Sequence, residues 1–599
     1  MADTIKKLSF TAEKIDKLLG VMDAAYGSTG GASIQVDAGH SDLEACVCDG
    51  ETDDSDRLQA FVDYIASKGG GELKLPQGKT IMIKKEIELK DNVSIFGCGE
   101  SSKIITDVGE SENGLNMLKA FDKKNIRLSN FYIENTGYGL SGTWEPMGTF
   151  DGVGACMLFA GCSNVVVDNC HVVRGGGTIA GEGVSNIYFS CCYNSKAVNN
   201  HIEYGDNGLM VDTWYRYIDA AHAMFENDNI VFANNTIEQM TGRGICIENK
   251  TDESKAIMKG NVTVVGNTIR LCAYAGIQGN NFWNTVITGN TIHGDCTDID
   301  GSTIIVFGGS TSATWYGIAI EDEAFQCIVS DNTIANTKVK GIYCKNAQNI
   351  VISNNNIVNM KPGSSILDKG EAICIENDEY PLTNVNVAGN NIYDALMGVR
   401  FILSVDARNS IVSNNTMTFT STDATRGIEL GALSYSSVNG NNISCVEQNA
   451  SFIGIMSNEG KLNTVNDNNI TQAGTGVKLI GDDGTVIDGN CISHCINGVG
   501  LDACTRTMIN SNFKTCTNAF DMANGMTTQS TKCQSFNSLF NNVTNVKNGT
   551  GILLRYYASA APRGTFEVGD RVINSTPASE TPVEWVYYSG AWHDGFTLA

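Results

Sequence analysis

The sequence of 599 residues is poor in basic residues, and this scarcity excludes two classes of partner. It contains 41 Lys and Arg against 66 Asp and Glu, which gives a formal net charge of -25 at pH 7. Binding of nucleic acid or of an anionic membrane requires a basic surface, because phosphate groups are negatively charged. We therefore expect neither nucleic-acid binding nor membrane insertion. The expected partner is neutral, or is an anionic polymer met through local basic residues.

Long apolar runs are also missing. No stretch is long enough to span a bilayer, and residues 1–6 lead into no apolar core of a signal peptide. The 20 cysteines form no Cys-x-x-Cys pair and no Cys/His zinc spacing, and the seven His are scattered along the chain. Cys246, Cys344, Cys374 and Cys491 lie within β-type runs. We expect free structural thiols in a protein made in a reducing cytoplasm, with neither a metal site nor a cofactor.

Leucine-rich and helical patterns are absent from most of the chain, but another repeat is present. A short β-branched run leads to an Asn, one further residue and usually an Ile, and then Gly opens a second apolar run. The repeated Asn positions are 169, 200, 235, 267, 290, 332, 355, 390, 415, 441, 468, 490 and 512. The tightest spacings, about 22 to 27 residues, are typical of a solenoid.

The strands between these Asn positions indicate which solenoid forms. Each is three to five residues of Val, Ile, Thr or Cys in alternation, with Gly, Asn and Asp at the turns. Several short strands per turn without a crossover helix predict an all-β fold, a parallel β-helix. Asn suits the repeated corner because it tolerates a left-handed backbone. Stacked Asn side chains can also bond to one another along the axis.

The start of the solenoid carries the most specific local signature. An acidic turn over residues 49–56 precedes a short helix over 57–67, followed by a Gly-Gly-Gly run, a strand over 72–75 and a Pro-Gln-Gly turn at 76–78. This arrangement resembles the opening of the pectate-lyase-like right-handed parallel β-helix superfamily, whose phage members are tailspike depolymerases. The resemblance implies a right-handed solenoid. It selects no chemistry, because this superfamily contains lyases, hydrolases, epimerases and adhesins. The acids of the opening are expected to be turn and helix-cap residues.

The composition along the chain predicts four segments. Residues 1–30 form an amphipathic helical attachment segment and a flexible joint. Residues 31–110 form the opening and cap of the β-helix, and residues 111–530 form the β-helix with its inserted loops. Residues 531–599 form a small β-rich module for trimerisation or glycan contact, in which Trp585 and Trp592 are expected to be mainly structural.

Strand alternation predicts a line of acids on one outward face. In runs such as 244–248 and 317–321, the apolar second and fourth residues must point inward, so the third and fifth point outward. The outward column reads Asp212, Glu248, Asn280, Glu321, Lys345 and Glu376. Asp212 and Glu248 would lie roughly 4.8 Å apart and Glu321 and Glu376 roughly 9.6 Å apart along the axis. These spacings suit a retaining and an inverting pair of catalytic carboxylates, respectively. We rank Glu321 with Glu376 first; the alternative is that all four acids are solvated strand ends.

Three long insertions flank the same region, at residues 213–229, 293–316 and 358–370. Such loops beside a solenoid face predict the walls of a groove. The residues expected to contact the substrate are Trp214, Tyr215, Arg216, Trp315, Tyr316, Tyr343, Lys345 and Arg400. In a lyase, by contrast, Lys345, Tyr343 or Arg400 would remove a proton beside a uronate carboxyl group.

The resemblance and the acid column together predict a phage-type tailspike that hydrolyses a bacterial surface polysaccharide. A lyase of the same fold, a non-cleaving glycan-binding adhesin and a structural virion protein stay open as alternatives. The resemblance further implies a virion protein made without a signal peptide in the host cytoplasm. It also implies a homotrimer that attaches to the phage tail or baseplate through its N-terminus. Outward Met210, Cys246, Ala319, Cys374 and Met456 are expected to form an exposed apolar stripe at a subunit contact.

Overall fold

The computed structural model describes most of the chain in two compact units. The described residues are 32–38, 40, 43–106, 115–135, 154–175, 185–217, 226–248, 260–294, 315–322, 324–360, 370–404, 407–521, 533–536, 538–548, 552–558, 566, 568–574 and 582–597. The first unit contains the described residues up to Thr268, and the second contains those from Ile269 onward. The N-terminal segment expected to be helical, residues 1–30, lies outside the described residues.

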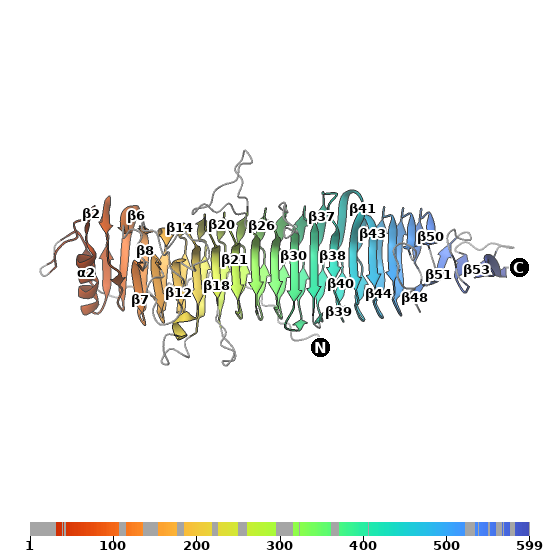
Figure 1. Cartoon of the computed structure of the whole chain (residues 1–599), viewed down its shortest axis with the longest axis horizontal. Coiled ribbons are helices and arrows are strands. Elements are labelled where there is room, and N and C mark those ends of the chain that lie inside the picture. Colours follow the sequence, from red (N-terminus) through yellow and green to blue (C-terminus); the bar gives the residue numbers. More distant parts are fainter. Residues whose placement is uncertain are drawn as a thin grey trace. The chain divides into compact units, whose positions relative to one another are not determined.

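The first unit is built from three parallel sheets whose strands follow one another in turn along the chain (Figure 1). Sheet I contains β1 (Ala32–Gln35), β3 (Gly71–Lys74), the first parts of β6 (Val93–Thr106) and β8 (Lys124–Asn135), β10 (Ser163–Asp168), β13 (Tyr193–Val198), β16 (Asp228–Ala233) and β19 (Val262–Val265). Sheet II contains β2 (Asp49–Asp53), β4 (Lys79–Met82), the later parts of β6 and β8, β11 (His171–Gly175), β14 (His201–Gly205), β17 (Thr236–Glu238) and β20 (Thr268–Arg270), whose first residue ends the unit. Sheet III contains β5 (Ile87–Glu88), β7 (Leu118–Phe121), β9 (Met157–Ala160), β12 (Ser185–Ser190), β15 (Asn207–Asp212) and β18 (Arg243–Glu248).

The second unit repeats the same three-sheet pattern. Its sheet I contains β22 (Val286–Thr288), β25 (Ile328–Ser330), β28 (Val351–Ser353), β32 (Asn386–Ala388), β36 (Ile411–Ser413), β40 (Ser437–Asn439), β42 (Thr464–Asn466), β44 (Val486–Ser493), β46 (Met508–Lys514), β48 (Cys533–Phe536), β51 (Ile552–Ala558) and β52 (Arg571–Asn574). Its sheet II contains β23 (Thr291–His293), β26 (Thr333–Ala335), β29 (Asn356–Val358), β33 (Asn391–Tyr393), β37 (Thr416–Phe419), the first parts of β41 (Asn442–Asn458) and β43 (Asn469–Ile480), the later parts of β44 and β46, and β49 (Leu539–Asn541). Its sheet III contains β21 (Ala275–Asn280), β24 (Tyr316–Glu321), β27 (Lys340–Lys345), β30 (Glu371–Asn377), β34 (Met397–Leu403), β38 (Arg426–Leu430), the later parts of β41 and β43, β45 (Asn497–Asp502), β47 (Asn518–Asp521) and β50 (Asn545–Asn548).

A small extra sheet and a terminal hairpin complete the second unit. The extra sheet is parallel and contains β31 (Leu382–Thr383), β35 (Ala407–Arg408) and β39 (Leu433–Ser434). Parallel pairing continues from β51 to β52, after which β53 (Pro582–Tyr588) and β54 (Ala591–Thr597) pair antiparallel. Within this hairpin, Trp592 packs edge-on against Phe566 and Tyr587, at ring-centroid distances of 4.8 and 5.4 Å.

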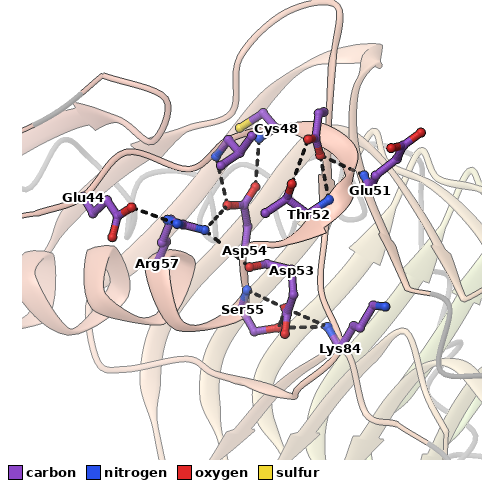
Figure 2. A network of polar contacts seen from close by, with 11 residues as sticks. Glu44, Cys48, Glu51, Thr52, Asp53, Asp54, Ser55, Arg57 and Lys84 are labelled. Carbon is purple, nitrogen blue, oxygen red and sulfur yellow. Dashed lines mark hydrogen bonds and ion pairs between the residues drawn. The ribbon is translucent and has the colours of Figure 1, made fainter.

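The acidic run at the start of the solenoid forms local turn contacts, as expected (Figure 2), but Asp54, the N-cap residue of the helix that follows, makes no side-chain cap hydrogen bond to that helix. Helix α2 runs over Ser55–Ser67, two residues earlier than expected. The buried Asp54 carboxylate accepts the Val47 and Cys48 backbone N–H groups at 2.9 and 2.8 Å. Asp49 in turn accepts the backbone N–H of Thr52 at 2.7 Å. These acids are therefore occupied in local hydrogen bonds.

The interior of each unit is filled by apolar side chains that repeat at one position per strand. In sheet III of the second unit, the inward column of β21, β24, β27 and β30 consists of four Ile residues with no exposed surface, Ile277, Ile318, Ile342 and Ile373. In the first unit, Phe189 stacks on Phe159 with ring centroids 5.3 Å apart. Burial of β-branched and aromatic side chains on all three sheets supplies the main driving force for folding.

The repeated Asn forms a buried ladder at the corner between sheets I and II. In the second unit it runs through Asn290, Asn332, Asn355, Asn390, Asn415, Asn441, Asn468 and Asn490. Each Oδ1 accepts two hydrogen bonds from the preceding Asn in the ladder, one from its backbone N–H and one from its Nδ2, at 2.9 to 3.0 Å. A shorter ladder joins Asn200, Asn235 and Asn267 in the first unit. The expected bonding of stacked Asn side chains is thus confirmed.

Two details of the corner differ from the expectation. The left-handed residue is not the ladder Asn but the one before it, such as Asn354 with φ 56° or Gly389 with φ 69°. Asn169 occupies this preceding place and has φ 54°, so Cys170 takes the ladder position of its rung. Ser511 likewise takes the last ladder position in place of Asn512. A buried amide and a left-handed turn are separate requirements, and adjacent residues satisfy them.

The cysteines are distributed through this framework as thiols. None of the nineteen that the structure describes forms a disulfide, and only Cys98 and Cys491 among them are exposed. Burial raises the pKa of thiols such as Cys170 and Cys246 to about 12, which keeps them protonated and unreactive. Within the described ranges, no helix combines the length and the apolar composition that crossing a bilayer requires.

The Asn ladder leads to a prediction for Asn390→Ala. This change leaves the buried backbone N–H of Asn355 without its acceptor and removes one of the two hydrogen bonds of Asn355 Nδ2, which keeps only its bond to the Val329 carbonyl. The Ile352 carbonyl also loses the Nδ2 donor of Asn390. Each buried polar group left unsatisfied costs about 1–3 kcal/mol, so we expect the free energy of unfolding to fall by about 3 kcal/mol or more. Asn391→Ala is the matched control, because Asn391 is exposed on the next position of the chain. Equal losses for the two variants in urea unfolding would show that the ladder adds no stability.

Candidate functional site

The strand register confirms the predicted outward column on sheet III of both units. Asp212 of β15 lies beside Glu248 of β18 in the first unit. In the second unit, Asn280 lies beside Glu321, and Lys345 lies beside Glu376. Glu321 and Glu376 are therefore separated by one strand, β27. The alternate apolar side chains of each strand point into the interior, and this fixes which side chains of the strand point outward.

Glu376 is held by two side chains of the neighbouring strand β27. The Tyr343 hydroxyl donates to Glu376 Oε2 at 3.0 Å, and the Lys340 ammonium lies 3.6 Å from the same oxygen. Lys340 Nζ also lies 3.5 Å from the centroid of the Tyr343 ring, a cation–π contact. The Glu376 side chain keeps 27% of its surface exposed. This carboxylate is thus fixed in position and open to solvent.

Glu321 has a different neighbour on the preceding strand, β21. The buried Gln278 side chain donates from Nε2 to Glu321 Oε2 at 2.5 Å. The Glu321 side chain itself is half-buried. The two acids are therefore positioned by different donors, an amide for Glu321 and a phenol with an ammonium for Glu376.

Aromatic rings extend from these acids along the same face. Tyr316 stacks on Tyr343 with ring centroids 5.4 Å apart, and Tyr274 meets Tyr316 edge-on at 5.5 Å. Trp315 lies 6.3 Å from Tyr274 and is 41% exposed. Burial raises the pKa of Tyr316 to about 12, and burial with the nearby Glu376 raises that of Tyr343 further. Both phenols thus remain protonated hydrogen-bond donors near neutral pH.

The two basic residues predicted to contact substrate are engaged in ion pairs. Lys345 Nζ lies 2.9 Å from Asp378, and this contact raises the pKa of Lys345. Arg400 Nη1 lies 2.6 Å from the fully buried Glu371, and its Nε lies 3.2 Å from Glu429. The sequence pattern placed both side chains on the outward face without identifying these acidic partners.

In the first unit, Asp212 lies beneath other side chains. It has no exposed surface, accepts a hydrogen bond from Ser190 Oγ at 2.6 Å and another from the Tyr188 hydroxyl, and accepts the Trp214 backbone N–H at 3.1 Å. Burial raises the pKa of Asp212 to about 7, and the charge of Glu248 acts in the same direction. Glu248 is half-buried.

Trp214 and Tyr215 cover this part of the face. They belong to the short 3-10 helix η1 (Trp214–Tyr217) and are only 9% and 5% exposed. Tyr215 stacks on Phe121 at 6.0 Å, and its hydroxyl donates to Asp122 at 2.8 Å. The Arg216 side chain lies outside the described part of the structure.

The expected exposed apolar stripe is wrong, because the chain covers most of it itself. Met210, Cys246, Ala319 and Cys374 are at most 3% exposed, and only Met456 is half-buried. The covering side chains are Tyr188, Trp214 and Tyr215 in the first unit and Tyr316 and Tyr343 in the second. Outward orientation on a strand therefore did not mean contact with solvent here.

The predicted groove walls are three insertions, at residues 213–229, 293–316 and 358–370. The central residues of the three insertions, 218–225, 295–314 and 361–369, lie outside the described residues. The described face therefore consists of the strands, of Trp214 and Tyr215 in the first unit and of Trp315 at the entry to β24 in the second.

One cluster escaped the sequence analysis, in which the His residues looked scattered. His171 and His201 stack with ring centroids 4.4 Å apart on sheet II of the first unit, beside Glu203. A signal was present in the sequence. Each His directly follows the ladder position of its repeat, at Cys170 and Asn200, and residues at equal repeat positions stack.

Comparisons with known proteins concern the fold. A family model described as "Right handed beta helix region" matches residues 223–417. Among curated proteins, none matches this sequence.

Three solved structures illustrate the similarity. The Dettilon tailspike protein is 13% identical, with 65% of this chain and 66% of that chain covered and a TM-score of 0.42. The tailspike protein of E. coli bacteriophage HK620, in complex with a pentasaccharide, is 12% identical, with 96% and 95% covered and a TM-score of 0.35. The catalytic unit of the GH87 α-1,3-glucanase from Streptomyces thermodiastaticus is 16% identical, with 76% and 70% covered and a TM-score of 0.37. Similarities this distant leave activity open. From its strand pairing and the family model, the chain is a right-handed parallel β-helix protein.

Proposed function

We propose that this chain binds and hydrolyses a bacterial surface polysaccharide, as a phage tailspike depolymerase does. The observation that supports this most is the outward face of β24, β27 and β30. There, two solvent-accessible carboxylates, Glu321 and Glu376, lie next to a row of tyrosines and the exposed Trp315. Glycoside hydrolysis requires two carboxyl groups, and aromatic rings bind the apolar faces of sugars.

The surroundings of the two carboxyl groups suggest which one acts as the catalytic base and which as the catalytic acid. Glu376 faces the Tyr343 hydroxyl and the Lys340 ammonium, which suits a carboxylate that activates water. Glu321 would then protonate the leaving oxygen. Their strands are two steps apart, roughly 9.6 Å at the backbone. Side chains that lean together bring the carboxyl groups within the range of about 6.5–9.5 Å that leaves room for a water molecule in an inverting enzyme.

Asp212 and Glu248 form the less favoured pair. Asp212 has no exposed surface and is surrounded by Tyr188, Ser190 and the backbone of Trp214. A sugar could reach it only if η1 moved away. In this proposal Asp212 holds η1 against sheet III and does not contact substrate.

The contacts also favour hydrolysis over the lyase reaction. A lyase base must lose its proton near neutral pH, but burial and Glu376 raise the pKa of Tyr343. Lys345 is similarly held as a cation by Asp378. Arg400 stays charged between Glu371 and Glu429. None of the three proposed lyase bases is poised to accept a proton.

The expected test of the proposed acids is the pair of variants Glu321→Gln and Glu376→Gln. Each removes one ionisable group with little change of shape, so cleavage of the substrate polysaccharide should fall by at least about 1,000-fold while binding persists. The assay screens capsular, O-antigen and exopolysaccharides for shortened chains and new reducing ends. Glu447→Gln, an exposed acid on β41, is the matched control.

The same assay separates the alternatives. New reducing ends together with the ultraviolet absorbance of unsaturated uronate would show that the enzyme is a lyase and not a hydrolase. Binding without shortening by the wild-type protein would leave a glycan-binding adhesin. Near-native cleavage by both Gln variants would mean that the column is only a solvated strand edge.

We further propose that the active form is a homotrimer within a virion, attached to the phage tail or baseplate through residues 1–30. With the apolar stripe covered, this rests on the sequence resemblance at residues 49–78. Light scattering of the full chain at micromolar concentration should give three times the mass of one chain. A monomer under those conditions would contradict the proposal.

The structural role of Asp212 has a pH signature. Its pKa rises from 3.8 to about 7 on folding, so the folded state disfavours the ionised form. The stability that this group supports is therefore complete below about pH 4 and is lost as the pH rises through about 7. Asp212→Asn does not titrate, so its free energy of unfolding should improve relative to wild type between pH 4 and pH 8. The measurement is urea unfolding at several pH values.

The control for this titration is Asp228→Asn, which changes an exposed carboxylate in the same unit. Its difference from wild type should depend little on pH. A flat difference for Asp212→Asn as well would show that Asp212 is ionised in the folded protein at low pH, contrary to its buried position.

A further inference from the structure

Two histidines and a glutamate converge on sheet II of the first unit, away from the acids of sheet III. His171 begins β11, and His201 begins β14 directly beside it in register. Glu203 lies two residues after His201 on the same strand and so points to the same side of the sheet. Strand pairing therefore fixes three side chains of metal-binding type at neighbouring positions.

The ligand atoms of these side chains are close together. His201 Nε2 lies 3.0 Å from Glu203 Oε1, and His171 Nε2 lies 3.5 Å from Glu203 Oε2. One ligand atom from each residue falls within 4.8 Å of both others. Ligands at about 2.0 Å from a tetrahedral Zn²⁺ are roughly 3.3 Å apart. The two His–Glu distances already bracket this value.

The Nε2 atoms of both histidines lie close to Glu203, but among the described residues neither contact has the geometry of a hydrogen bond. Both Nε2 atoms are buried and have no hydrogen-bond partner in the structure. The opposite nitrogen of His171, Nδ1, lies 3.0 Å from Glu100 Oε1. A carboxylate on one ring nitrogen fixes the tautomer that leaves the other nitrogen free to bind a metal.

A fourth oxygen lies next to the cluster. Glu238 of β17 pairs in register with Glu203, and its Oε1 lies 3.5 Å from His201 Nε2. The side chains of His201 and Glu203 are 38% and 26% exposed, so the cluster borders solvent, and an ion would reach the buried Nε2 atoms when the rings tilt. Two imidazoles with one or two carboxylates match zinc-type sites and do not match Ca²⁺ or Mg²⁺, which take oxygen ligands.

We propose that His171, His201 and Glu203 bind one divalent transition-metal ion of the Zn²⁺ class, with Glu238 or water as a further ligand. The rings stack nearly parallel, with an angle of 17° between their planes. Binding therefore requires each ring to tilt so that its Nε2 lone pair points at the shared ion. The ion would link β11 and β14, and through Glu238 also β17, across the exposed side of sheet II.

The test uses the full chain, stripped of metal and titrated with Zn²⁺ by calorimetry. We expect one Zn²⁺ per chain and an affinity that falls at least tenfold in His171→Gln, His201→Gln and Glu203→Gln. His494→Asn is the control, because it removes an exposed His elsewhere and Asn tolerates the left-handed backbone there. Ca²⁺ and Mg²⁺ should bind at least 100-fold more weakly.

Cobalt absorption gives a second measurement that does not depend on the folding of a variant. Co²⁺ bound to wild-type protein should show visible bands of a nitrogen–oxygen site. A thiolate charge-transfer band would place the ion on cysteine and overturn the proposal. Two other results would also overturn the proposal. One is a wild-type protein that binds no Zn²⁺, and the other is an equal Zn²⁺ affinity in the wild type and in folded Glu203→Gln protein.

Discussion

The buried corner between sheets I and II is the constraint on which the rest of the fold depends. A chain that turns sharply on every rung exposes backbone N–H groups to an interior without water, and each needs a partner. The Asn ladder supplies one, because Oδ1 of each rung accepts the backbone N–H and Nδ2 of the rung before. This pattern works only if successive rungs stay in register. It therefore fixes which outward residues stand side by side, including Glu321 and Glu376 with one strand between them.

The outward face of sheet III shows how the fold accommodates charged side chains on neighbouring strands. Neighbouring strands lie about 4.8 Å apart, so like charges at equal positions would repel. In the second unit the buried Glu371 instead faces Arg400, and Glu376 faces Lys340. In the first unit Asp212 and Glu248 stand side by side, and the raised pKa of Asp212 reflects its burial and this neighbour. The second unit thus keeps accessible acids, whereas the first buries one of its pair.

Much of the architecture follows from periodicity alone. The repeat predicts a parallel β-helix, the Asn ladder of each unit and the alignment of the acids, because each depends only on chain spacing and alternation. Strand alternation predicts which side chains point inward and which point outward, but it does not predict what covers an outward side chain. The sequence pattern therefore contained no sign that Trp214 and Tyr215 bury Met210. The ion-pair partners of Lys345 and Arg400 also depend on side-chain geometry that a one-dimensional pattern does not contain. The pairing of His171 with His201 was predictable in principle, since both follow a ladder position.

The Asn ladder also gives the second unit an electrical polarity that its formal charges do not describe. From Asn332 to Asn490 every Oδ1 accepts from the preceding rung, and from Asn290 to Asn468 every Asn donates an N–H to the following one. The amide dipoles therefore add head to tail, as peptide dipoles do in an α-helix, and hydrogen bonds in such a chain polarise one another. The Asn290 end carries the partial negative charge of a carbonyl, and the Asn490 end the partial positive charge of an N–H group, which approaches Ser511 Oγ at 3.5 Å. A stack of uncharged side chains thus creates a field along the unit whose direction is set by the order of the rungs.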